Sequence, residues 1–159
     1  MIKQKPTPIT EENFAPFGNY WNLCIQPRVR TSKYEEYLTT DEPVYQPMRF
    51  GMTMCENGNR FTVRSMERHN TTEEVLFAAD KPIVLSVANS DPSGDPLAED
   101  VRSFLLKPGD AVRMNKGIWH DACHAAKGEA FYYFMAHGTG QGDEIVWHDV
   151  QGPTVEVEF

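Results

Sequence analysis

The stretch of sequence that decides the fold is GDAVRMNKGIWHDACH, residues 109–124. It contains two short runs of β-forming residues, Ala111 to Met114 and Ile118 to His124, separated by the turn-forming residues Asn115 to Gly117. Short runs joined by tight turns are typical of antiparallel sheets. This stretch therefore predicts two strands of an antiparallel sheet.

The same pattern continues on both sides of this stretch, from Phe50 onward. We expect further strands at Phe50 to Met54, Phe61 to His69, Glu74 to Ala79, Ile83 to Ala88, Val101 to Leu106, Phe131 to His137 and Ile145 to Asp149. Turn-forming residues such as Asn57-Gly58 separate these runs, and residues 89–100 form a long polar loop. The sequence therefore predicts an all-β fold, an antiparallel sandwich or barrel.

The N-terminal part of the chain is less regular. Thr10 is a suitable helix N-cap, Glu11 and Glu12 suit the first helical turn, and residues 16–18 would end the helix. We therefore expect one short helix near the N-terminus. The remainder of residues 1–49 contains several prolines and is expected to wrap around the barrel as edge strands and loops.

Length, charge and composition exclude several classes of protein. A chain of 159 residues suits one compact domain, and a net charge of -8 disfavours binding to nucleic acid. No apolar run approaches the roughly 20 residues that cross a bilayer, and the first residues lack a secretory signal pattern. We expect a cytoplasmic protein with no membrane partner, in which Cys24, Cys55 and Cys123 are reduced and mainly serve packing.

The expected strand from Phe61 to His69 carries the first candidate site residues. Alternate residues of a strand share a face, so Glu67 and His69 lie side by side on the face that also carries Phe61 and Val63. If that face points inward, a carboxylate and an imidazole enter an apolar cavity, where a metal ion or polar ligand would offset their burial. The alternation that continues into Leu76 and Ala78 places Glu74 on an interior face as well.

The second group of candidates lies in residues 109–124. Gly109, Asn115, Gly117, His120 and His124 have the spacing Gly-x5-Asn-x-Gly-x2-His-x3-His. On one continuous strand, His120 and His124 share a face. Two imidazoles, His69 and His120, together with two carboxylates, Glu67 and Glu74, favour a functional cavity over four separate structural residues.

These two segments resemble the motifs of the cupin superfamily. Residues 109–124 are similar to the second cupin motif, and Glu67-x-His69-x4-Glu74 is similar to the first, with Glu67 at its first His. The resemblance implies a single cupin-type antiparallel β-barrel domain over residues 1–159, jelly-roll-like, with a barrel core at residues 50–149. It also implies that Glu67, His69, Glu74 and His120 hold a divalent metal ion.

A narrower resemblance covers nearly the whole chain. Residues 10–18 resemble the opening of the ureidoglycolate lyases, and residues 66–69 and 115–120 resemble two further segments of that family. The family consists of cupin-fold enzymes, usually homodimers, that split ureidoglycolate into glyoxylate and urea. This chain has Thr72 and Glu74 where the family commonly has Gly and Gln, and a glutamate favours a metal site there.

A lyase of this kind needs a base, a cation for the substrate carboxylate and a divalent ion. We expect Glu67 or His124 to act as the catalytic base. The substrate-binding candidates are Arg64, Arg113 and Lys116, which are near the motifs in sequence. Mixed nitrogen and oxygen ligands suit Mn, Ni, Zn or Fe.

Two other functions use the same cavity. One is a metal-dependent cupin that isomerises, epimerises or oxidises a sugar or another small polyol. The other is a non-catalytic module that binds a small acid. Outside the cavity, we expect Trp119 to face away from His120 and to serve packing, and His137 and His148 to be structural or surface residues.

Overall fold

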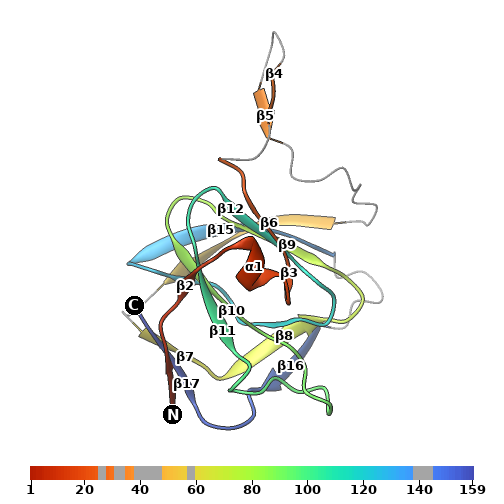
Figure 1. Ribbon diagram of the computed structural model, residues 1–159, viewed down its shortest axis with the longest axis vertical. Coiled ribbons are helices and arrows are strands. Elements are labelled where there is room, and N and C mark those ends of the chain that lie inside the picture. The colour runs from red at the N-terminus through yellow and green to blue at the C-terminus, as the bar shows by residue number, and fades with distance from the viewer. Residues whose placement is uncertain (25–27, 31–34, 38–47, 57–59, 138–144) are drawn as a thin grey trace.

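The computed structural model describes residues 1–24, 28–30, 35–37, 48–56, 60–137 and 145–159, which form an almost entirely β fold with one short helix (Figure 1). The first large sheet has the strand order β16-β8-β13-β10-β11-β2, and β14 also pairs with β10. Its strands are β2 (Thr7–Pro8), β8 (Ser65–His69), β10 (Ile83–Ala88), β11 (Arg102–Leu106), β13 (Trp119–His120), β14 (His124–Ala125) and β16 (Ile145–Asp149).

The second large sheet has five strands in the order β3-β12-β9-β15-β6. These strands are β3 (Gly18–Asn22), β6 (Met48–Glu56), β9 (Glu74–Ala78), β12 (Asp110–Met114) and β15 (Glu129–His137). All of its neighbouring strands are antiparallel. The all-β prediction is therefore confirmed, and Ile83–Ala88 and Ile145–Asp149 have the bounds that the sequence predicts.

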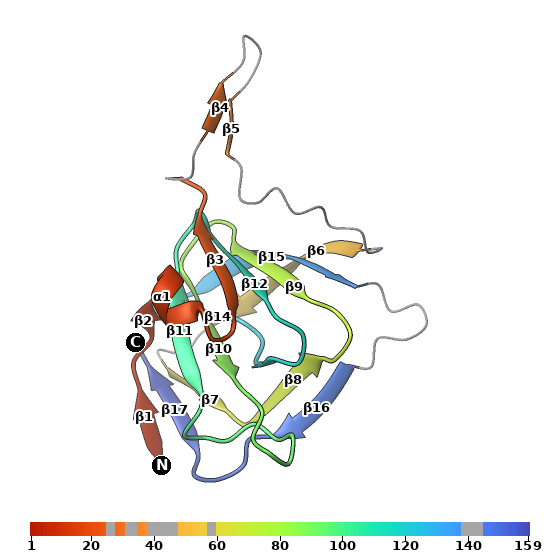
Figure 2. The same ribbon diagram turned by 45° about the vertical axis from the view of Figure 1, so that its right-hand side comes forward.

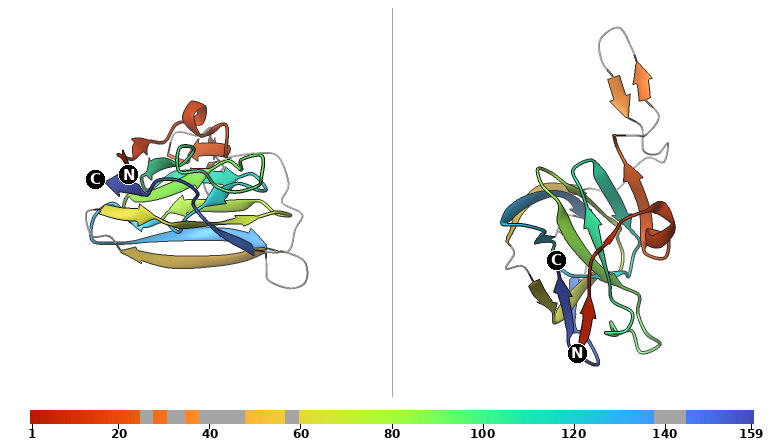
Figure 3. Two further views of the ribbon diagram at one scale, coloured as in Figure 1. Left: turned by 90° about the horizontal axis from the view of Figure 1, so that it is seen from below. Right: turned by 60° about the vertical axis from the view of Figure 1, so that its left-hand side comes forward.

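Two smaller sheets complete the described strands. One has the order β1-β17-β7, with β1 at Ile2–Gln4, β7 at Arg60–Val63 and β17 at Val155–Glu158. Strands β1 and β17 run parallel, which places the N-terminal and C-terminal segments side by side (Figure 3). The other is a hairpin of β4 (Arg28–Arg30) and β5 (Glu35–Tyr37), which stands away from the barrel (Figure 2).

The main hydrophobic core lies between the two large sheets. Strand β10 contributes Ile83, Leu85 and Val87 from the first sheet, while Leu76 on β9 and Val112 on β12 come from the second. These side chains are almost completely buried, as the hydrophobic effect requires of a barrel interior. The interior face of each strand can therefore be read from its contribution to this core.

A second core covers the outer face of the first sheet. Val84 and Ala88, the alternate residues of β10, pack there with Val155 and Val157 of β17. Fully buried Trp119 belongs to this core, and the Arg68 guanidinium lies 4.5 Å from the centre of its ring. The expectation that Trp119 faces away from His120 and serves packing is confirmed.

The N-terminal segment supplies the short helix and several edge strands. Helix α1 (Glu11–Phe14) begins after Thr10, whose hydroxyl accepts a hydrogen bond from the Asn13 backbone, while the Asn13 side chain accepts one from the Thr10 backbone. Strands β1, β2 and β3 each lie at an edge of a sheet. Within the described residues, no helix is long and apolar enough to cross a membrane.

The structure differs from the sequence prediction at residues 61–69, which form two strands rather than one. Strand β7 ends at Val63 and pairs with β17, whereas β8 begins at Ser65 and pairs with β16 and β13. The break at Arg64 changes the alternation, so that Val63 and Met66 enter the same second core. Val63 therefore does not share the interior face with Glu67, although Glu67 and His69 do share a face, as expected.

Residues 118–124 also form two strands, and this separates the two histidines. His120 pairs with Val87, which points into the main core, whereas His124 pairs with Val84, which points into the second core. Residues opposite each other in an antiparallel pair share a face. The expectation that His120 and His124 lie on one strand face is wrong, because residues 121–123 interrupt the alternation.

Thiol reactivity provides a test of this burial pattern. All three cysteines are free; Cys24 is exposed, while Cys55 and Cys123 are buried. Burial raises the pKa of Cys55 to about 11 and that of Cys123 well above its usual value, so both remain thiols at pH 8. Titration with Ellman's reagent at pH 8 should detect one thiol per folded chain and three after denaturation. Rapid reaction of two thiols in the folded protein would contradict this arrangement.

Candidate metal centre

Four acidic and imidazole side chains meet where the two large sheets face each other. Glu67 and His69 come from β8, and His120 comes from the adjacent strand β13, where it pairs directly with Glu67. Glu74 is the first residue of β9 in the opposite sheet. The four candidate metal ligands that the sequence suggests are thus brought together in space.

The distances within this cluster are short. Glu74 Oε2 lies 3.0 Å from His120 Nε2 and 3.5 Å from His69 Nε2, and Glu67 Oε1 lies 3.6 Å from His120 Nε2. Glu67, His69 and His120 also each present a potential ligand atom within 4.8 Å of the others. Ligand atoms that each lie about 2.1 Å from one ion are separated by roughly 3.0–3.5 Å. The spacing of this cluster therefore suits a shared metal ion.

Two buried atoms of the cluster lack a hydrogen bond of acceptable geometry among the described residues: Glu74 Oε2 and His120 Nε2. His120 Nδ1 lies 3.2 Å from the Ile118 carbonyl oxygen, to which it can only donate. In the neutral ring, Nε2 then carries a lone pair directed at a carboxylate. A lone pair and a carboxylate repel each other unless a positive charge lies between them. That charge is either a second proton on the imidazole or a cation that both residues bind. The donor set of His120 and Glu74 therefore fits a divalent metal ion.

Burial and charge give the two carboxylates different properties. Burial alone would raise the pKa of Glu74, but His120 and His69 lower it to about 2, so Glu74 remains ionised. Burial raises the pKa of Glu67, with the nearby His120 acting in the opposite direction. Burial disfavours charge on His120, but Glu74 and Glu67 raise its pKa above the ordinary value. Glu74 is therefore a permanent anion, while Glu67 is the carboxyl better suited to accept a proton.

The members of the cluster differ in their exposure to solvent. The Glu67 side chain is 22% exposed, whereas those of Glu74 and His120 are 12% and 6% exposed. Behind them, Met114 pairs with Glu74 and Val87 pairs with His120, and both belong to the main core. Glu67 is therefore the member of the cluster that is most accessible to a ligand.

Sequence comparison assigns the chain to a family of enzymes. A family model described as ureidoglycolate lyase matches residues 1–157, nearly the whole chain. The chain belongs to the ureidoglycolate lyase family. This family is part of the cupin superfamily, in agreement with the β-barrel and with the resemblance of the two motifs. No curated protein sequence matches the chain.

Solved structures show the same fold at low sequence identity. The TDP-quinovose 3,4-ketoisomerase WlaRB of Campylobacter jejuni is 12% identical, with a TM-score of 0.53, and the match covers 80% of this chain and 90% of that chain. RmlC of Streptococcus suis, solved with dTDP-D-xylose, is 8% identical, with a TM-score of 0.52 over 88% of this chain and 73% of that one. At these identities, the similarity shows that this chain has a cupin-like fold. It shows nothing about the substrate of this chain.

His124, the second candidate base, lies outside the cluster. Its ring stacks on Phe61, with the ring centres 3.6 Å apart, and its Nε2 lies 3.2 Å from Asp121 Oδ2. Asp121 also contributes to the electrostatic environment of Glu67. His124 lies on the opposite face of the first sheet from His120, so the structure does not place it beside the other candidates.

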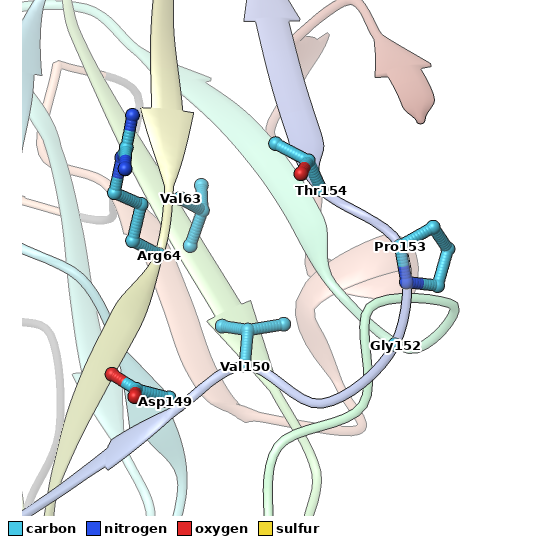
Figure 4. Close-up of a pocket in the computed structure, with 7 residues that line it drawn as sticks. All are labelled: Val63, Arg64, Asp149, Val150, Gly152, Pro153 and Thr154. Carbon is cyan, nitrogen blue, oxygen red and sulfur yellow. The ribbon is translucent and has the colours of Figure 1, made fainter.

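The three candidate cations occupy different places. Arg64 is exposed and lines a surface pocket with Asp149 and Thr154, and none of the cluster residues lines this pocket (Figure 4). Arg113 alternates with the core residues of β12, so it lies on the outer face of the second sheet. There it donates to Asn19 Oδ1 and approaches Glu73. The structure brings neither arginine to the cluster.

Lys116 lies in a turn whose backbone is hydrogen-bonded to a cluster residue. It is the exposed central residue of the turn at 115–117, and the next backbone N–H, that of Gly117, donates to the carbonyl oxygen of His69 at 2.8 Å. This hydrogen bond fixes the turn against the end of β8. The Arg113 side chain is held on the outer face of the second sheet, whereas Lys116 is exposed on a turn that is bonded to His69.

One residue near the cluster is absent from the sequence-based set. Trp147 on β16 pairs directly with Glu67 and is exposed. The sequence predicts β16 as a strand but contains no signal for its partner or register. Alternate residues of this strand lie on opposite faces, with Ile145 and Trp147 on one face and Val146 and His148 on the other. The structure shows that the face with Trp147 is the one that meets Glu67.

Proposed function

We propose that this protein cleaves ureidoglycolate into glyoxylate and urea with the help of a bound divalent metal ion. The observation that carries the proposal is the cluster of Glu67, His69, Glu74 and His120 between the two large sheets. The family match over residues 1–157 supports the same reaction.

We assign His69, His120 and Glu74 as the residues that hold the metal ion. Glu74 is the buried, permanently charged carboxylate, and the imidazole orientation of His120 leaves Nε2 free to bind a cation. When bound, a divalent ion supplies Lewis acidity that stabilises negative charge on the substrate oxygen atoms. The ion is Mn, Ni, Zn or Fe, all of which accept this mixture of nitrogen and oxygen ligands.

Glu67 is the proposed base. It is the most exposed member of the cluster and lies where a ligand enters, and its raised pKa suits proton transfer. Its carboxylate accepts the proton of the substrate hydroxyl, the carbon–oxygen double bond of glyoxylate forms and the carbon–nitrogen bond breaks. The departing nitrogen takes up a proton from the Glu67 carboxyl, which yields urea and restores the carboxylate.

Lys116 is the proposed partner of the substrate carboxylate. The hydrogen bond from Gly117 to His69 holds its turn beside the cluster, and its ammonium group supplies the charge that a carboxylate requires. Arg64 and Arg113 are less suitable, because one lines a separate pocket and the other is engaged on the outer face of the second sheet.

The proposal is tested by supplying the purified protein with Mn, Ni, Zn or Fe and measuring urea release from ureidoglycolate. We expect stoichiometric formation of glyoxylate and urea, and loss of the reaction after removal of the metal by a chelator. Absence of urea with all four metals would contradict the proposed reaction.

We also expect a homodimer, which the family usually forms. The edge strand β6 exposes three large apolar side chains, Phe50, Met52 and Met54, and exposed apolar patches mark interaction surfaces. Light scattering on the eluting protein should give twice the 18.1 kDa mass of one chain. A mass of one chain at micromolar concentration would contradict a stable dimer.

A further inference from the structure

Trp147 occupies an unusual position at the entrance to the cluster. It is the central residue of β16, the edge strand of the first large sheet, and lies directly opposite Glu67 in the antiparallel pair. Glu67 in turn pairs with His120 on its other side. His120, Glu67 and Trp147 therefore form a row across three adjacent strands, and Figures 1 and 2 show β8 and β16 side by side.

The register places the indole on the same face as the cluster. Directly opposite residues of an antiparallel pair share a face, with Cβ atoms about 4.5–5.5 Å apart. The Glu67 side chain meets His120 on the interior face. Trp147 consequently extends this face from the most exposed member of the cluster toward solvent.

Packing among the residues that the structure describes does not account for this tryptophan. Its side chain is 54% exposed, and it belongs to neither hydrophobic core. The opposite face of β16 holds the strand in place, because Val146 packs on the second core and His148 Nδ1 lies 2.5 Å from Asp95 Oδ1. An indole that stays exposed beside a polar cluster is available to a ligand.

The chemistry of the indole indicates which part of a ligand it contacts. A tryptophan offers a flat, apolar π surface, which favours stacked contact with another planar group. In ureidoglycolate the ureido group is planar, whereas the carbon that carries the hydroxyl is tetrahedral. We infer that Trp147 forms one wall of a subsite for the planar ureido leaving group and so selects ureido-bearing acids over simple hydroxy acids.

This inference rests on the proposed function and deepens it by assigning the leaving-group side of the site. With Glu67 next to Trp147, the reacting hydroxyl lies toward the base while the ureido group lies over the indole. Trp147 is a specificity residue in this arrangement, since it takes no part in proton transfer. Its replacement should therefore weaken binding of the ureido group more than it slows the chemical step.

Two probes separate the ureido contact from the rest of the site. Ureidoacetate carries the planar ureido group and the carboxylate but no hydroxyl, and glycolate carries the hydroxyl and carboxylate but no ureido group. Calorimetry on metal-loaded Trp147→Ala should show about tenfold weaker binding of ureidoacetate, or roughly 1.4 kcal/mol, with glycolate binding unchanged. Trp147→Phe should recover most of the affinity, because a phenyl ring keeps a π face.

The matched control is Trp21→Phe. Trp21 is a partly exposed tryptophan on β3, where its ring lies near Arg113 on the outer face of the second sheet. This variant should bind both probes as the wild type does. In the urea assay, Trp147→Ala should raise KM about tenfold and change kcat less than threefold, the pattern of lost binding rather than lost catalysis.

The outcomes distinguish this inference from the proposed function. Unchanged ureidoacetate binding in Trp147→Ala, or an equal loss for both probes, would overturn the ureido subsite even if the wild type releases urea. A wild type that binds ureidoacetate through Trp147 but releases no urea would overturn the reaction and leave the subsite supported. A wild type that binds neither probe and releases no urea would overturn both.

Discussion

Replacement of His120 by alanine should remove the bound metal ion and lower urea release by at least about 10³-fold. His120 Nε2 is the atom closest to Glu74 Oε2, and it also approaches Glu67. Without this imidazole, the site loses a nitrogen ligand and Glu74 loses the positive partner that keeps its pKa low. Metal analysis of the purified variant and its urea-release rate provide the two readouts.

A matched control is His148→Ala, because His148 lies on the opposite face of the first sheet and pairs with Asp95. It should retain the metal ion and the wild-type rate. His120→Gln preserves more of the side-chain volume and serves if the alanine variant unfolds. A metal content and a rate equal to those of the wild type in a folded His120 variant would contradict the assignment of this ligand.

Replacement of Glu67 by glutamine should lower kcat by roughly 10²–10⁴-fold, which is the usual contribution of a general base. Glutamine keeps the shape of the side chain but cannot accept the substrate proton. Because His69, Glu74 and His120 remain, we expect the variant to retain its metal ion, and KM should change little. Steady-state kinetics together with metal analysis separate the loss of the base from the loss of a ligand.

The same assay decides between the two bases that the sequence leaves open. His124 stacks on Phe61 and approaches Asp121, on the opposite face of the first sheet from His120. His124→Gln should therefore reduce kcat less than tenfold. A larger loss of kcat in His124→Gln than in Glu67→Gln would reverse the assignment of the base.

The sequence predicts the strands well where turn-forming residues bound a run of β-forming residues. Residues 83–88 and 145–149 have the expected bounds, and the helix begins after Thr10 as its capping residues indicate. The prediction is wrong where a strand breaks without glycine or proline, at Arg64 and at residues 121–123. At these points the pairing with a neighbouring strand decides where a strand ends, and a single sequence does not contain that information.

The difference between local sequence pattern and strand pairing also explains which site residues could be placed from the sequence. Glu67 and His69 could be placed on one face from local alternation, and Glu74 could be placed inward from its continuity with Leu76 and Ala78. His124 could not be placed, because its face depends on the break before it. Trp147 was not among the candidates, because its proximity to Glu67 follows from the β8–β16 register, which brings together residues 80 positions apart.

The most direct measurement is anomalous diffraction from crystals grown with Mn²⁺. The anomalous difference map should contain one strong peak about 2.0–2.3 Å from Nε2 of His69, Nε2 of His120 and Oε2 of Glu74. A map with no peak between these three atoms, from crystals of protein that releases urea, would contradict the metal centre on which this account depends.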